Sequence, residues 1–450
     1  MSKSAPFADE LGTEYLSADE AARWGECFTS SLLAAGLPAK SFVVCQAQNS
    51  AVLLAAIYGC LRAELAPVII SASLSQTERD AMLDGLPYAV ILRDEELTAL
   101  CTSSITRSPT LTEQFGCRPM HFTSGTSGRP KGVWSGWLSD EQSEALAREE
   151  RETWDFNQDD VHLVSGPFSH SAPLRFALHT LLNGGSVLVP RTFNASVASS
   201  LIDNVATTAF MAPIHLQRIL DAAPPEHSSL RLLAHAGSNC PELVRRRAIA
   251  CFGADVLVEF YGSTEGQFTQ CSASEWLTHP GTVGRARLGR SIRSDTDGRL
   301  WCKAPKYARF EYWKDPEKTK EAWEEGWFTV GDLGRVDENG YVYLEGRRSD
   351  LIITGGVNVY PAEIELALSQ VEGIEEIVVF GVEDPEWGQR VCAAFLGTAN
   401  VGDVLESSTA MLAPYKRPKI VIKADELPRT HSGKVDRAQL PSLIQVNRSQ

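Results

Sequence analysis

Short apolar runs rich in β-branched residues alternate with helix-like segments along roughly the first 260 residues of the chain. The clearest of these runs read SFVVCQAQ, APVIIS, YAVILRD, DVHLVSG, SVLVP, ATTAFMA and DVLVEFYG. Strands that alternate with helices are typical of βαβ units, in which helices cover a parallel sheet. We therefore predict an α/β fold, with a large N-terminal domain built from α/β subdomains.

The pattern changes near Gly326, and the residues after it predict a smaller domain of another type. Two alternating strands flank the pair Asn339-Gly340, which indicates a hairpin. A helix is predicted to begin near Pro361, because apolar residues then recur at helical spacing. We expect a small, mobile α+β C-terminal domain. The predicted division is an N-terminal domain at residues 1–346, a hinge at residues 347–350 and a C-terminal domain at residues 351–450.

The composition indicates a soluble globular protein. Of the 450 residues, 43% are hydrophobic and 22% are charged, which is close to ordinary globular proteins. The formal net charge of −15 argues against nucleic acid or an anionic membrane as the main partner, because both are bound through Lys and Arg. We expect a small-molecule partner.

The sequence also bears on where the protein is found. The first residues lack the apolar core of a signal peptide, and the most apolar stretch, residues 51–61, is too short to span a bilayer. That stretch is predicted to be a buried helix. The ten cysteines are scattered without metal-type spacing, which favours reduced thiols. We therefore expect a cytoplasmic protein without a membrane span.

The segment HFTSGTSGRPKGV concentrates glycines, hydroxyl groups and a lysine. Glycines let backbone N–H groups turn toward an anion, hydroxyl groups add donors, and the lysine adds positive charge. The candidate phosphate-binding residues are Thr123, Ser124, Gly125, Thr126, Ser127, Gly128 and Lys131. A solvated turn is the alternative, because these residue types are common in loops and the spacing is not that of a P-loop.

The segment VLVEFYGSTEG places polar residues where a predicted strand ends. Ligands of α/β sheets bind at the carboxyl ends of strands. Glu265 could bind Mg²⁺, which takes one or two carboxylates and completes its shell with phosphate and water. Tyr261 could stack on a base. Taken singly, a glutamate in a loop is usually solvated and a tyrosine at a strand end is usually core.

Three further segments complete a pattern that no single motif establishes. They are GWFTVGDLG with Asp332, LEGRRSDLIITGGVNVYPAEIE, and LPRTHSGKVDR with Lys434. In this order and at these separations, the segments resemble the adenylate-forming superfamily of acyl-CoA synthetases, peptide-synthetase adenylation domains and luciferases. The resemblance covers the chain from about residue 40 to about residue 440.

Several runs look most like the bile-acid and related acid–CoA ligase branch of that superfamily. They are GPFSHSAPLRFAL, HAGSNCPELVRR, EWLTHPGTVGRA, YWKDPEKT and RRSDLIITGGVNVYPAEIE. The resemblance implies an enzyme that uses ATP and Mg²⁺ to form an acyl-adenylate, then transfers the acyl group to coenzyme A. Transfer to a carrier-protein thiol or an amine is an alternative, and an adenylate-binding protein without turnover is a lesser one. The sequence leaves open whether the protein is a homodimer.

The resemblance also implies which residues bind the nucleotide. The Gly-rich segment would hold the β- and γ-phosphates, Thr264 would contact the α-phosphate, and Glu265 would bind Mg²⁺. The residues that would frame the adenine are Tyr261, Gly237 and Ser238, and those that would hold the ribose are Asp332 and Arg347. A carboxylate suits ribose because two adjacent hydroxyl groups can donate to it.

Lys434 matches the catalytic lysine that the superfamily carries on its C-terminal domain. A cation that bridges the attacking carboxylate and the α-phosphate lowers the barrier to adenylation. After adenylation the small domain would rotate about a hinge at Ser349 and bring Gly355 and Gly356 to the site. Ser349 departs from the Asp or Lys that much of the wider superfamily has there.

The acid would bind near GPFSHSAPLRF, and the resemblance places a histidine of this run beside the acyl group. The candidate residues of the acid pocket are His170, Phe168, Ala172 and Phe176. For His170 the alternative is a buried, hydrogen-bonded histidine without chemistry, since carboxylate activation needs no general base. The apolar residues could equally be core. We expect a hydrophobic, aromatic or alicyclic acid.

Two features depart from the superfamily pattern. The stretch between Gly284 and Trp301 is shorter than usual. The N-terminus lacks the strand–turn–helix opening that relatives often show, so we expect an abbreviated first subdomain.

Overall fold

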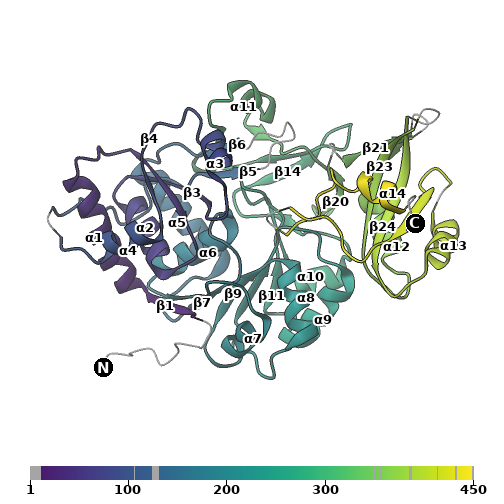
Figure 1. The fold of residues 1–450 in the computed structure, drawn as a ribbon, viewed down its shortest axis with the longest axis horizontal. Helices are drawn as coiled ribbons and strands as arrows, with labels where there is room; N and C mark the ends of the chain where they lie inside the picture. Colours follow the sequence, from purple (N-terminus) through teal and green to yellow (C-terminus); the bar gives the residue numbers. More distant parts are fainter. Residues whose placement is uncertain are drawn as a thin grey trace. The chain divides into compact units, whose positions relative to one another are not determined.

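The computed structural model places the chain in two units, which Figure 1 shows with the element labels used below. Unit 1 comprises Met1–Ser291 and Cys302–Phe328, and unit 2 comprises Ile292–Trp301 and Thr329–Gln450. The structure describes residues 12–105, 107–123, 131–347, 350–354, 357–384, 388–412, 414–430 and 433–447. The two units do not end at the predicted domain boundary, because the hairpin that precedes residue 347 belongs to unit 2. The predicted hinge at residues 347–350 is a point about which the C-terminal domain would rotate, and the division into units does not test rotation. The hinge therefore stays a prediction.

Unit 1 alternates strands and helices over most of its length. Its strands are β1 (Glu14–Ser17), β2 (Phe42–Ala47), β3 (Ala66–Ser71), β4 (Tyr88–Leu92), β5 (His121–Thr123), β6 (Lys131–Trp134), β7 (Val161–Val164), β8 (Ser186–Val189), β9 (Thr208–Met211), β10 (Leu232–His235), β11 (Leu257–Glu259), β12 (Thr269–Ser272), β13 (Arg285–Ala286), β16 (Glu311–Tyr312), β17 (Trp323–Glu324) and β18 (Trp327–Phe328). Its helices are α1 (Ala18–Ala34), α2 (Ala51–Arg62), α3 (Gln76–Met82), α4 (Asp94–Cys101), α5 (Asp140–Trp154), α6 (Ser171–Leu182), α7 (Ala195–Asn204), α8 (Pro213–Ala222), α9 (Glu242–Phe252), α10 (Ala273–Thr278), the 3-10 helix η1 (Lys306–Ala308) and α11 (Pro316–Ala322).

The largest sheet of unit 1 has the strand order β1-β8-β7-β9-β10-β11-β12-β13. Its five inner strands from β8 to β11 are parallel, and β1, β12 and β13 are antiparallel to their neighbours. The chain runs from β7 to β8 on one side and then to β9 on the other, so the strand order reverses at β7. The predicted α/β fold is confirmed, and such a reversal is where ligands of α/β sheets bind.

A second parallel sheet, β3-β2-β4, lies in the first hundred residues. The predicted buried helix is α2, and its first turn is capped by the Ser50 hydroxyl, which accepts from the Leu53 N–H at 3.1 Å. A Cβ on Gly59 would lie 2.4 Å from the Gly25 carbonyl oxygen. Glycine at this crossing therefore lets α1 and α2 touch through their backbones.

The expectation that the N-terminus lacks a strand and helix was wrong. Strand β1 pairs with β8, and α1 follows it directly behind a capping box between Ser17 and Glu20. A strand of four residues with one buried position gives too short an alternation to be found by its pattern.

Unit 2 is a small α+β unit, as predicted. Its elements are β19 (Asp332–Val336), β20 (Val342–Arg347), β21 (Ile352–Thr354), β22 (Val357–Val359), α12 (Pro361–Leu368), β23 (Ile374–Asp384), β24 (Gly388–Gly397), α13 (Val401–Met411), β25 (Ile420–Lys423) and α14 (Pro441–Asn447). The chain passes between the units at β14 (Ser291–Ser294) and β15 (Leu300–Lys303). The hairpin predicted at Gly340 joins β19 to β20, and β22-β21-β24-β23 form a sheet that β25 extends.

The structure bears on the predicted absence of a membrane span and on the state of the cysteines. Among the described residues, no helix is both long and apolar enough to cross a membrane. All ten cysteines lie in the described part of the chain, and none of them forms a disulfide.

A buried group of charged side chains joins α5 to α6 and to the segment after β13. Glu149 and Glu150 from α5 are 4% and 2% exposed. Arg287 lies 3.1 Å from Glu149 and 3.5 Å from Glu150, while Arg175 of α6 lies 3.9 Å from Glu150. Burial alone would raise the pKa of Glu150, but Arg175 and Arg287 lower it to about 2.

This pKa predicts acid sensitivity of the fold. A carboxyl group whose pKa is lowered on folding stabilises the protein above its unfolded pKa, near 4.5, and that contribution is lost as the pH falls toward 2. The shift corresponds to roughly 3 kcal/mol of unfolding free energy. Glu150→Gln should therefore flatten the loss of stability between pH 5 and pH 2 in denaturant titrations. Glu152→Gln, at an exposed position of the same helix, should leave that slope unchanged.

Candidate active site

Three loops that carry predicted site residues follow parallel strands of the large sheet. Residues 165–170 follow β7, Gly237 and Ser238 follow β10, and residues 260–267 follow β11. Strands β10 and β11 are adjacent, with His235 opposite Glu259 at their ends. The carboxyl ends of parallel strands share one edge of a sheet, so the predicted adenine residues lie together at this edge.

The loop after β11 is a tight turn that depends on glycine. Ser263 N–H donates to the Gly266 carbonyl at 2.8 Å, and Gly266 N–H donates back to Ser263 at 3.3 Å. A Cβ on Gly262 would lie 2.8 Å from the Gly266 carbonyl oxygen, so only glycine fits there. The turn leaves Thr264 half-buried and Glu265 only 6% exposed.

Glu265 and Lys131, predicted from separate segments, meet around a residue that the sequence interpretation missed. The Tyr312 hydroxyl donates to Glu265 Oε1 at 2.8 Å. The Lys131 ammonium lies over the Tyr312 ring, 5.0 Å from its centroid. Tyr312 belongs to the run YWKDPEKT, which contributed to the resemblance, but neither its position nor its spacing marks it as a partner of Glu265.

A second lysine adds to the positive charge of this cluster. Burial lowers the pKa of Lys131, and repulsion from Lys318 lowers it further, while Glu265 and Asp315 act in the opposite direction. Two ammonium groups that destabilise each other are both stabilised by an anion between them. The cluster of Lys131, Lys318, Glu265 and Tyr312 is called the phosphate cluster below.

The residues of the phosphate cluster fit a magnesium nucleotide. The described part of the chain has no group of three or more His, Cys, Asp or Glu side chains placed to hold a metal ion. A single buried carboxylate suits Mg²⁺, which draws its other ligands from phosphate and water, whereas it would not suit a metal held by protein alone. The two lysines suit the phosphates.

Thr123 is the last residue of β5 and Lys131 is the first residue of β6, and the two strands are antiparallel. Thr123 is opposite Lys131 in the register of the two strands. The other predicted phosphate-binding residues, which lie outside the described residues, are Ser124, Gly125, Thr126, Ser127 and Gly128.

Two side chains fix the loop predicted to bind the acid. Asn49, between β2 and α2, donates from Nδ2 to the Gly166 carbonyl and accepts from the Phe168 N–H, both at 2.9 Å. His121 of β5 donates to the Phe168 carbonyl at 3.2 Å, and burial lowers the pKa of His121 to about 4, which keeps it neutral. The loop is therefore tied both to the first subdomain and to the hairpin of the Gly-rich segment.

The predicted acid-pocket residues have different environments. His170 is exposed at the residue before α6, so the alternative of a buried histidine was wrong. Phe168 and Phe176 are each 1% exposed and belong to two core clusters, and Ala172 is partly buried against the cluster of Phe176. Their roles in acid binding stay predictions.

Asn49 provides a test of the acid loop. Asn49→Ala should raise the KM for the acid about tenfold while the KM for ATP stays within twofold, because two hydrogen bonds that hold residues 166–168 are lost. Asn183→Ala is the matched control, since the Asn183 side chain donates one hydrogen bond to the His179 carbonyl at the other end of α6. Steady-state kinetics with both substrates measures the two constants. Equal changes in both KM values would contradict a specific role of the loop.

Unit 2 carries the remaining predicted residues. Asp332, which is 8% exposed, lies opposite Arg347 in the register of β19 and β20, so the two predicted ribose residues are neighbours. Lys434 is exposed in a turn where its carbonyl accepts from the Thr430 N–H at 2.7 Å. Gly355, Gly356 and Ser349 lie outside the described residues.

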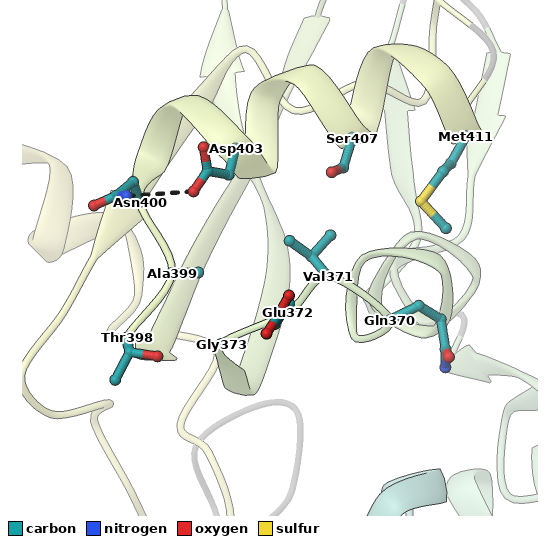
Figure 2. A pocket seen from close by; sticks show the side chains of 10 residues that line it. All are labelled: Gln370, Val371, Glu372, Gly373, Thr398, Ala399, Asn400, Asp403, Ser407 and Met411. Atoms are coloured by element: carbon teal, nitrogen blue, oxygen red, sulfur yellow. Dashed lines mark hydrogen bonds between the residues drawn. The ribbon is translucent and has the colours of Figure 1, made fainter.

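A groove of about 600 Å³ on unit 2 contains none of the predicted residues. Figure 2 shows that its side chains come from the turn after α12, the end of β24 and one side of α13. Asn400 and Asp403 interact within it at 3.3 Å.

Comparison with known proteins identifies the family of the chain. The model of the AMP-binding enzyme family matches residues 117–299, and that of the AMP-binding enzyme C-terminal domain matches residues 363–434. The chain is 32% identical to a 2-succinylbenzoate–CoA ligase of Geobacillus sp. (strain WCH70), over 72% of this chain and 69% of the relative. It is 34% identical to the 3-[(3aS,4S,7aS)-7a-methyl-1,5-dioxo-octahydro-1H-inden-4-yl]propanoyl:CoA ligase of Rhodococcus jostii (strain RHA1), over 70% of this chain and 62% of the relative.

A solved structure extends the similarity over almost the whole chain. The crystal structure of ATP-bound MatB from Rhodopseudomonas palustris superposes with a TM-score of 0.81 at 28% identity, and covers 94% of this chain and 92% of MatB. The relatives are ligases of different acids, so they show the superfamily rather than the bile-acid branch. The chain therefore belongs to the adenylate-forming superfamily of AMP-binding enzymes, as a member of its AMP-forming acid–CoA ligases.

Proposed function

We propose that this enzyme joins a hydrophobic, aromatic or alicyclic carboxylic acid to coenzyme A, with ATP and Mg²⁺ and through an acyl-adenylate. The observation that carries the proposal is the phosphate cluster, in which Glu265 and Lys131 meet at Tyr312. The cluster combines one buried carboxylate with two cations in the same unit as the predicted adenine and acid loops. This combination supports a site where an acid reacts with a magnesium nucleotide.

In the proposed first step, the acid carboxylate attacks the α-phosphorus of ATP. A bond forms between the carboxylate oxygen and phosphorus, and the bond from the α-phosphorus to the bridging oxygen breaks, so that pyrophosphate leaves. Lys131, Lys318 and the Gly-rich segment would hold the β- and γ-phosphates. Mg²⁺, bound by Glu265, would neutralise phosphate charge. Thr264 would contact the α-phosphate.

We assign the remaining predicted residues to positioning and to the developing charge. Tyr261, Gly237 and Ser238 would frame the adenine, and Asp332 with Arg347 would hold the ribose. Lys434 would bridge the carboxylate and the α-phosphate in the first step.

In the proposed second step, the thiol sulfur of coenzyme A attacks the acyl carbon. The carbon–sulfur bond forms, the thiol proton is lost to solvent, and AMP leaves with the carboxylate oxygen. Rotation of the C-terminal domain about residues 347–350 would first remove Lys434 and bring Gly355 and Gly356 to the site. The adenylate makes AMP a good leaving group, so this step needs a positioned thiol more than a strong base.

The acid class rests on the acid loop and on the names of the relatives. The two relatives described above act on an aromatic acid and on a bicyclic propanoate. Two of the predicted pocket residues are buried phenylalanines, Phe168 in the loop and Phe176 in α6. An acid of the bile-acid type remains within this proposal, because it shares the alicyclic character of the second relative's acid.

The experiment that tests the function is thioester formation from ATP, Mg²⁺ and coenzyme A with fatty, aromatic and steroid-like acids. The proposal predicts that one hydrophobic class drives AMP release and that coenzyme A accelerates it. Acceleration by a carrier protein or a simple amine in place of coenzyme A would assign another acceptor. Activity restricted to short polar acids would contradict the proposed acid class.

A further inference from the structure

A buried ion pair links the two segments that are proposed to frame the adenine. Arg245 Nη2 lies 2.5 Å from Glu259 Oε1, and the two side chains are 6% and 8% exposed. Arg245 lies in the first turn of α9, which follows the loop of Gly237 and Ser238. Glu259 ends β11, two residues before Tyr261. The pair therefore connects the helix that follows the Gly237 loop to the strand that precedes the Tyr261 loop.

The surroundings of the pair hold it in one geometry. The Arg245 guanidinium stacks on the ring of Trp276 from α10, 4.6 Å from the ring centroid. Figure 1 shows α9 and α10 beside β11, which agrees with these contacts. His235, at the end of β10, lies opposite Glu259 in the sheet. His235, the ion pair and Trp276 line a small cavity of about 10 Å³. Strand, helix and aromatic ring thus meet at one buried point.

Stability alone does not account for this pair. Removal of two charges from water opposes folding, and replacement of such a pair by well-packed apolar residues is often neutral or stabilising. Burial raises the pKa of Glu259 to about 7 although Arg245 opposes the shift, which shows how strongly the carboxylate is desolvated. Glu259 Oε2, Arg245 Nε, His235 Nδ1 and Trp276 Nε1 are buried and have no hydrogen-bond partner within the described residues. The pair and its surroundings therefore bury polar atoms that oppose folding, beside the loops that are proposed to bind the nucleotide.

We propose that Arg245 and Glu259 are positioning residues for the nucleotide, which fix the spacing between the Gly237 loop and the Tyr261 loop. The inference rests on the proposed function, because that function assigns the adenine to these loops. The pair contacts no predicted phosphate residue, so it acts on the adenosine end of the nucleotide. AMP and ATP should then depend on the pair equally, whereas Lys131 should matter for ATP alone.

The test is binding of AMP and of ATP to the full chain by calorimetry. Arg245→Met should weaken both by about tenfold, because a small displacement of a binding segment has a large cost. Arg246→Met is the matched control, since Arg246 also lies over Trp276, at 5.3 Å, but has a 52% exposed side chain and pairs with Glu242 outside the site. The control should bind both nucleotides normally.

A double variant separates positioning from general stability. Arg245→Met with Glu259→Leu leaves no unpaired buried charge, so its melting temperature should recover toward the wild-type value. Its affinity for AMP should stay about tenfold reduced. Recovery of AMP affinity together with the melting temperature, or normal AMP affinity in Arg245→Met, would overturn the proposal.

Failure of the underlying function gives a different result. If the wild-type chain binds AMP but no acid drives ATP consumption, the ligase function fails while the binding experiment still decides the role of the pair. If the wild-type chain does not bind AMP, the adenine assignment and the positioning role fall together.

Discussion

Lys434→Ala is expected to lower acid-dependent pyrophosphate release by about 10²- to 10³-fold. The reason is electrostatic, since attack of a carboxylate on a phosphate brings two anions together and this lysine is proposed to bridge them. Lys434 lies in an exposed turn, so the substitution should leave the melting temperature unchanged. The measurement is coupled detection of pyrophosphate with ATP, Mg²⁺ and the preferred acid.

The second half-reaction provides the sharper part of this test. A chemically prepared acyl-adenylate should still react with coenzyme A in the Lys434→Ala variant, at a rate within about threefold of wild type. Lys423→Ala is the control, because Lys423 is another exposed lysine of unit 2 and donates to the Ala399 carbonyl at 3.1 Å. An equal loss in both half-reactions would show that Lys434 does not have the proposed role.

Glu265→Gln is expected to reduce pyrophosphate release by about 10²-fold or more and to raise the Mg²⁺ concentration needed for half-maximal rate. An amide keeps the shape of the side chain but loses the charge that would bind the metal and balance Lys131. Removal of Mg²⁺ with a chelator should stop the wild-type reaction. Rates measured across a Mg²⁺ series separate weaker metal binding from slower chemistry.

Tyr312→Phe should give a smaller defect in the same direction, of about tenfold. It removes the hydroxyl group that donates to Glu265 at 2.8 Å but keeps the ring under Lys131. Tyr307→Phe is the matched control, because its hydroxyl also donates to a buried glutamate, Glu149 at 2.7 Å, outside the proposed site. A defect of equal size in the control would assign both tyrosines to stability rather than to the metal site.

The regular part of the fold could be predicted from the sequence because its signals are local. The apolar run of α2 and the Asn339-Gly340 turn each depend on neighbouring residues, and both predictions were confirmed. Strand β1 could not be predicted in this way, since it is held by pairing with β8, about 170 residues away. A short strand takes its stability from its partner and leaves almost no pattern of its own.

In the candidate site, too, residues that lie in a local motif could be predicted, and residues defined by distant contacts could not. Glu265 and Lys131 were found because each lies in a glycine-rich motif, and the structure brings them together. Tyr312 and Asn49 were missed, because their contacts join segments 47 and more than 100 residues apart, which no spacing reveals. Exposure of His170 could not be foreseen either, since it depends on the course of the loop before α6 in three dimensions.

The most direct test of the central claim is exchange of labelled pyrophosphate into ATP, measured with the acid and Mg²⁺ but without coenzyme A. Exchange occurs only if the enzyme forms an acyl-adenylate reversibly, so it isolates the first step from the choice of acceptor. We predict exchange that requires both the acid and Mg²⁺ and that is lost in Lys434→Ala. Absence of exchange with every fatty, aromatic and steroid-like acid, in a protein that binds ATP, would contradict adenylation and leave a nucleotide-binding protein without turnover.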